Sequence, residues 1–94
     1  MQITLNGKTY IAPTPKGRMV RKAYELIEKL SPTEVKTSDL DELAAYAVEL
    51  FGGQFTIDDF YDGIGAKEML PTLGYFVNLM LGRIKEKLDQ LPNG

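Results

Sequence analysis

The sequence contains no cysteine and no histidine. Without cysteine, the chain has no disulfide, no thiolate nucleophile and no sulfur ligand for zinc. Without histidine, it lacks the usual base of a Ser-His-Asp triad and the commonest nitrogen ligand of metal ions. The sequence therefore argues against an enzyme, and we expect no catalytic, cofactor-binding or metal-binding residues.

Long hydrophobic runs are also missing. Nowhere do 18 apolar residues follow one another, and the opening MQITLNGKTY has neither the basic region nor the apolar stretch of a secretion signal. We therefore expect a soluble intracellular protein that has no membrane partner.

Acidic residues are absent from residues 1–24, which carry five basic side chains. Residues 25–62 carry ten acidic residues against two lysines, although the net charge of the whole chain is only −2. Such a separation is typical of solvated helix faces, and it also steers partners or a second copy of the chain. Self-association is therefore one prediction from the charge layout.

The basic side chains of residues 1–24 suggest a second kind of partner, nucleic acid, through contacts with phosphates. Two observations weigh against it. The isoelectric point is near 5.0, and Arg18 and Arg21 alternate with Met19, Val20 and Ala23 as on a helix that packs against a core. Nucleic-acid binding stays the alternative to a protein-binding function.

Length and hydrophobic periodicity predict one mainly α domain over residues 1–94, with three to four helices and an N-terminal β-hairpin. Asn6 and Gly7 join two short runs of strand-like residues, which predicts the hairpin over 1–12. Apolar residues at helical spacing then predict helices over 16–30, 39–51, 57–62 and 66–90.

Local signals refine these helices. Ser38 or Asp39 is the expected N-cap of the helix over 39–51, and Thr56 followed by Asp59 resembles a capping box. Pro71 predicts either a kink or a helix start near Leu70. The expected buried faces are Met19, Val20, Ala23, Leu26, Ile27 and Leu30 in the first helix, and Leu40, Leu43, Ala44, Ala47, Val48 and Phe51 in the second.

Two short motifs resemble ligand-binding sequences but lack residues that those sequences need. Asp58 and Asp62 fit positions one and five of a calcium loop, but Phe60 and Met69 then occupy positions that need oxygen ligands. The run from Gly63 begins like a dinucleotide-binding fingerprint, yet Glu68 stands where the third glycine belongs and repels a pyrophosphate. Neither motif predicts a metal or a cofactor.

The predicted C-terminal helix is the feature that most needs covering. Leu70, Val77, Ile84 and Leu91 recur every seven residues, and between residues 75 and 81 only Asn78 is polar. A helix that is apolar on nearly every side must pack inside the chain or against another chain. Spacing alone is compatible with both.

Aromatic residues are concentrated in the segment before that helix, where they serve either a core or a docking surface. Together with the apolar middle of the C-terminal helix, they give the predicted partner-binding residues. These are Phe55, Phe60, Tyr61, Tyr75, Phe76, Leu79 and Met80.

Three stretches of the chain resemble a known family. They are ITLNGKTYIAPTPKGRMVRKAYEL, DLDELAAYAVELFGGQFTIDDFYDGI and MLPTLGYFVNLMLGRIKEKLDQLPN, of which the run FGGQFTIDDFYDGI is the most specific. The chain resembles, over essentially its full length, the tail assembly chaperones of long, non-contractile-tailed phages and prophages of Gram-positive bacteria.

The resemblance implies a small helical, non-enzymatic protein that acts in the host bacterial cytoplasm and is absent from the mature virion. It implies binding to the tape-measure protein and recruitment of tail-tube subunits during tail morphogenesis. It brings no catalytic residues to this chain. The alternative remains a small phage regulatory or structural protein that binds nucleic acid through its basic first helix.

Overall fold

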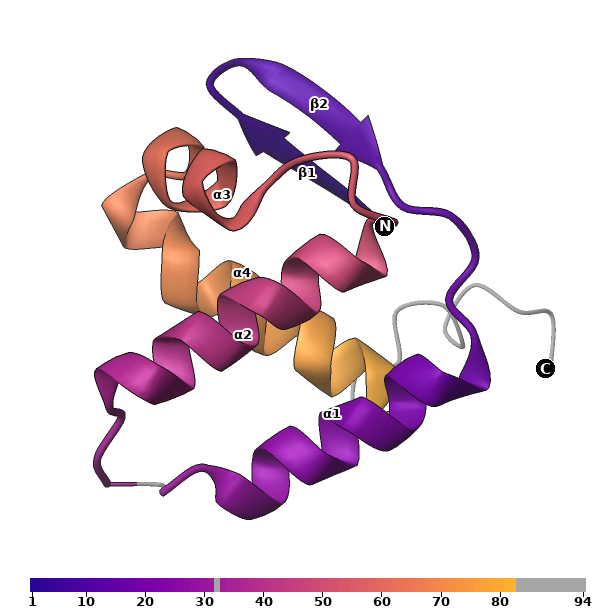
Figure 1. Ribbon diagram of the computed structural model, residues 1–94, viewed down its shortest axis with the longest axis vertical. Coiled ribbons are helices and arrows are strands. Elements are labelled where there is room, and N and C mark those ends of the chain that lie inside the picture. Colours follow the sequence, from indigo (N-terminus) through magenta and orange to yellow (C-terminus); the bar gives the residue numbers. More distant parts are fainter. Residues whose placement is uncertain (32, 83–94) are drawn as a thin grey trace, which may run out of the picture.

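A computed structural model describes residues 1–31 and 33–82 of the chain. Within these residues a two-stranded antiparallel hairpin precedes four helices, so the predicted fold class is confirmed (Figure 1). The elements are β1 (Gln2–Leu5), β2 (Lys8–Ile11), α1 (Gly17–Lys29), α2 (Thr37–Leu50), α3 (Ile57–Gly63) and α4 (Ala66–Met80).

The hairpin turns at Asn6 and Gly7, whose φ angles of 51° and 79° are both positive. This is the backbone conformation that a tight two-residue hairpin turn requires, and glycine adopts it without steric cost. The register pairs Leu5 with Lys8 and Ile3 with Tyr10. Strand alternation then buries Ile3 and Leu5 on the side that faces the helices.

The helices enclose one apolar core below the hairpin. Figure 1 shows the hairpin at one edge of the molecule and α1 at the opposite edge, with α2 and α4 between them. β1 packs beside α3, where the Asn6 N–H donates to the Gly63 carbonyl at 3.0 Å. The largest fully buried side chains are Phe51, Phe60, Phe76, Leu50 and Leu73.

The helix predicted over 39–51 is observed over Thr37–Leu50, and its N-cap is Lys36 rather than Ser38 or Asp39. Asp39 lies in the first turn instead, where its carboxylate accepts a hydrogen bond from the Lys36 N–H at 2.9 Å. The same acidic residue therefore stabilises the helix start from inside the helix, through a free backbone donor.

Two buried faces differ from the prediction. Val20 is 38% exposed on α1, although the spacing of its neighbours predicts burial. On α2, Tyr46 and Leu50 are buried, 4% and 2% exposed, and neither belongs to the predicted stripe. α2 packs against α1, α3 and α4, and a helix with several neighbours buries a wider arc than a single stripe describes.

α3 begins with the predicted capping box. The Thr56 Oγ1 accepts from the Asp59 N–H at 3.0 Å, and the Asp59 carboxylate accepts from the Thr56 N–H at 3.0 Å. Two backbone donors that the first turn leaves without helical partners are thereby satisfied.

The helix predicted over 66–90 ends at Met80 instead of continuing. Gly82 has a φ of 76°, and its N–H donates to the Leu79 carbonyl at 3.1 Å. A glycine in this left-handed conformation commonly follows the last turn of a helix, which accounts for the end of α4 at Met80. α4 begins at Ala66, not near Leu70, and includes Pro71. The remainder of the prediction, 83–90, lies outside the described residues.

A candidate protein-binding surface

Three of the predicted partner-binding residues belong to the core. Phe55, Phe60 and Phe76 are 4%, 0% and 2% exposed. The Phe55 and Tyr10 rings meet edge to face, with 5.0 Å between their centroids. The centroids of the Phe76 and Phe51 rings are 5.5 Å apart. In this chain these three side chains hold the fold together and present no surface of their own.

The other four, Tyr61, Tyr75, Leu79 and Met80, are half-buried. Tyr61 lies on α3, which precedes α4 in the chain. Leu79 and Met80 lie at the C-terminal end of α4. The structure therefore brings the last two together and leaves Tyr61 apart. The apolar surplus predicted for residues 75–81 is partly hidden, because Phe76 and Val77 are buried while their neighbours keep some exposure.

Tyr61 bridges α3 to α2. Its hydroxyl donates to the Asp41 carboxylate at 2.6 Å. Burial, followed by the hydrogen bond and the negative charge of Asp41, raises the pKa of Tyr61 to about 12. This contact fixes the position of the half-buried ring against α2.

Leu79 and Met80 line a groove of about 350 Å³ at the end of α4. The opposite wall is the connection from β2 to α1, residues 12–16, which we call the strap; it descends along one side of the molecule in Figure 1. The lining is mostly apolar and open to solvent. It comprises Met1, Ala12, Pro13, Thr14, Pro15, Leu79 and Met80, and we call it the strap groove.

A second, smaller groove of about 130 Å³ lies where α1 and α4 approach each other, and we call it the α1/α4 groove. Leu70 stands at its edge, 53% exposed, and a Cβ placed on Gly74 would meet nothing within 4 Å. Sequence reasoning missed both residues as candidate contacts, although their spacing of four puts them on one helix face. The lining is Ile27, Leu30, Leu43, Leu70, Leu73, Gly74, Val77 and Asn78.

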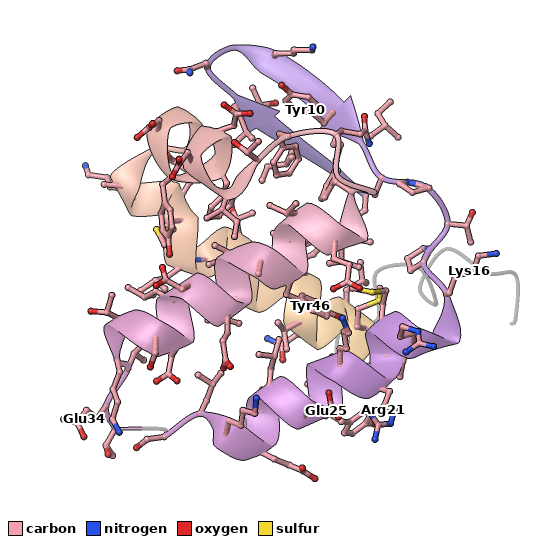
Figure 2. All side chains as sticks on the ribbon, in the orientation of Figure 1. Tyr10, Lys16, Arg21, Glu25, Glu34 and Tyr46 are labelled. Carbon is pink, nitrogen blue, oxygen red and sulfur yellow. The ribbon has the colours of Figure 1, made fainter. Side chains whose placement is uncertain are left out.

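Part of the basic segment is neutralised within the chain. The Lys22 ammonium contacts both carboxylate oxygens of Glu49 on α2, at 2.7 and 2.8 Å. Arg21 pairs with Glu25 one turn away on α1. Figure 2 shows Arg21 and Glu25 on the outer side of α1, and Lys16 where the strap meets that helix.

Beside these ion pairs, Tyr46 joins the two helices. It points from α2 toward α1 in Figure 2, and its hydroxyl donates to the Met19 carbonyl at 2.6 Å. Burial, with a smaller effect of the Glu49 charge, raises the pKa of Tyr46 to about 12. Spacing alone could not assign this tyrosine a partner 27 residues away.

The acidic residues around the candidate calcium loop lie on α3 and are not arranged as metal ligands. Asp58, Asp59 and Asp62 are exposed, and Asp59 is occupied in the capping box. In residues 1–31 and 33–82, no group of three or more histidine, cysteine, aspartate or glutamate side chains is arranged to hold a metal ion.

The same described ranges contain no helix with the length and hydropathy needed to cross a bilayer.

Comparison with known proteins assigns the chain to a family. No curated protein and no solved structure matches it. The sequence profile described as phage tail chaperone protein matches residues 1–92, which is nearly the whole chain. The hairpin, the four helices and the two apolar grooves described above are thus features of a chain that belongs to the phage tail chaperone protein family.

Proposed function

We propose that this phage tail chaperone binds the tape-measure protein and helps to recruit tail-tube subunits during tail morphogenesis. The observation that carries the proposal is the strap groove, where half-buried Leu79 and Met80 face the strap across about 350 Å³. A groove of this size, with an apolar lining, takes one or two large side chains of a partner.

The strap groove suits an amphipathic helix of the tape-measure protein, which we call the client. Such a helix places anchors at spacings of three and four residues, and an apolar groove takes them in turn. The α1/α4 groove adds a second anchor point, because exposed Leu70 and the open space above Gly74 allow close approach. A chaperone that binds an elongated client through many such weak contacts needs no catalytic group.

The chain acts, in this proposal, in the host bacterial cytoplasm and leaves before the virion is complete. The ion pairs of Lys22 and Arg21 support protein binding over the nucleic-acid alternative. Each of these basic groups already has a carboxylate partner, so fewer charges are available to phosphates. Self-association through the separated charges is a further part of the proposal.

Co-expression with the tape-measure protein tests the function. We expect the client to stay soluble only when this chain is present. We also expect Met80→Asp to lower the apparent affinity of the chain for the client about tenfold, because the substitution places a charge in the strap groove. Lys67→Glu is the control, since Lys67 is exposed and lines neither groove.

Two results would count against the proposal. One is a client that is equally soluble without the chain. The other is binding of the chain to nucleic acid that weakens steeply as salt rises, which is the behaviour of a phosphate-binding protein.

A further inference from the structure

The strap is anchored at its beginning. The Ala12 N–H donates to the Met1 carbonyl at 2.9 Å, and the Gln54 side-chain amide donates to the carbonyl of Ile11, just before the strap, at 2.8 Å. A Cβ on Gly52 would lie 3.6 Å from the Pro13 ring, so the strap packs against the turn after α2. Pro13 and Pro15 restrict their own φ angles. The surface is therefore formed before any partner arrives.

The strap lines two hollows. One is the strap groove, and the other is a hollow of about 320 Å³ between the strap, the start of α1 and the end of α2. Both use Pro13, Thr14 and Pro15 as a shared wall. The second hollow is completed by Lys16, Arg18, Met19, Glu49 and Leu50. We call the two hollows together the strap surface.

The rim of the strap surface is positive in a chain that is negative overall. Lys16 and Arg18 are exposed, and neither makes an ion pair with any described residue. Glu49 is the acidic member of the lining, and both of its oxygens contact Lys22. Its charge is therefore balanced by Lys22, and among residues 1–31 and 33–82 neither Lys16 nor Arg18 has an acidic partner beside the apolar hollows.

We propose that the strap surface binds an acidic amphipathic segment of another protein, with apolar anchors in the hollows and carboxylates against Lys16 and Arg18. Charge complementarity selects this occupant over a neutral or basic segment, because like charges at an interface oppose binding. Arg18 can hold a carboxylate with two parallel hydrogen bonds, which adds geometric selectivity. The inference rests on the proposed chaperone function and states the chemistry of the client segment.

Two synthetic helical peptides of about 20 residues test the proposal. They share the same leucine positions and differ only in carrying glutamate or lysine on the flanking positions. Binding of each to the full chain is measured by fluorescence anisotropy at about 0.15 M salt. Long-range attraction between separate copies is largely screened there, whereas a partly buried carboxylate in direct contact with Lys16 or Arg18 is screened much less. We expect the glutamate peptide to bind about tenfold more tightly, although the protein itself is acidic.

Charge reversal provides the matched variants. Lys16→Glu combined with Arg18→Glu should remove or invert the preference for the glutamate peptide, while circular dichroism confirms that the fold is kept. Lys67→Glu changes the net charge in the same direction at a site outside the strap surface, and it should leave the preference intact. A change of affinity with all three substitutions alike would mean that overall charge, not this surface, selects the peptide, and would overturn the proposal.

Three further outcomes are decisive. Equal binding of both peptides overturns the inference but leaves the chaperone function standing if the client is still kept soluble. An oligomer that persists at about 0.15 M salt and dissociates on charge reversal assigns the strap surface to a second copy, and also overturns the inference. Selective binding of the glutamate peptide, lost only on reversal of Lys16 and Arg18, supports it.

Discussion

At the scale of single residues, Tyr46 shows how one polar atom can join two helices. Its ring lies in the core and its hydroxyl reaches the Met19 carbonyl on α1. Without this partner, the buried hydroxyl would have lost its hydrogen bonds to water and gained none in the protein, which is unfavourable. The residue therefore contributes through its ring and through the single bond that its hydroxyl makes.

Replacement of Tyr46 by phenylalanine isolates that bond. We expect Tyr46→Phe to lower the free energy of unfolding by about 1 to 2 kcal/mol, because the apolar ring is kept while the hydrogen bond is lost. Urea denaturation measures the change. Tyr24→Phe is the matched control, because Tyr24 is 53% exposed, and it should stay within about 0.5 kcal/mol of the parent chain.

The same variant has a pH signature. The folded-state pKa of Tyr46, about 12, lies above the ordinary value of 10.0. Its contribution to stability is therefore fully present below pH 10 and is lost as the pH rises toward 12. Tyr46→Phe should flatten the decline of stability in this window, with part of it remaining from Tyr61, whose pKa is also raised. An unchanged decline would mean that Tyr46 titrates as it does in the unfolded chain.

At the scale of elements, the contact between α3 and β1 depends on a glycine at the end of α3. The Gly63 carbonyl accepts from Asn6 at the hairpin turn. A Cβ added at Gly63 would lie 2.8 Å from the Leu5 Cβ and 3.2 Å from the Leu5 Cα. The two elements can approach this closely only because one of them has no side chain at the contact.

Substitution at Gly63 tests the closeness of the contact. We expect Gly63→Ala to lower the free energy of unfolding by about 1 to 3 kcal/mol, since the backbone of β1 must shift to admit the methyl group. Thermal and urea denaturation measure it. Gly17→Ala is the control, because a Cβ there would meet nothing within 4 Å. Equal effects of the two substitutions would argue against a steric cause.

At the scale of the whole molecule, charge is divided between two regions. The exposed acids Asp58, Asp59 and Asp62 lie on α3, and the exposed cations Lys16 and Arg18 lie where the strap enters α1. Figure 1 places α3 and the start of α1 at opposite corners of the molecule. Two copies can therefore meet head to tail, an arrangement that need not close into a ring.

Such contacts between exposed charges are weak and are screened by salt. We expect sedimentation to show association at about 0.02 M salt, which reverts to a 10.5 kDa monomer near 0.15 M. Lys16→Glu together with Arg18→Glu should abolish the association at low salt. A strict monomer at every salt concentration, with and without client, would contradict self-association.

The sequence alone determined those features that depend on residues close together in the chain. The turn at Asn6 and Gly7 and the capping box of Thr56 and Asp59 each involve neighbours, so their chemistry can be recognised locally. Gly82 also carried a local stop signal, but the seven-residue repeat that passes through it predicted a longer helix than the one observed.

Only the tertiary structure decided which apolar side chains are hidden. Phe60 and Tyr61 are adjacent and equally plausible contacts by spacing, yet one is fully buried and the other reaches Asp41 at the surface. The strap surface likewise combines residues from both ends of the described chain with the connection between β2 and α1. The burial of a side chain depends on its contacts with segments that are distant in the sequence, and the residues next to it in the chain do not determine those contacts.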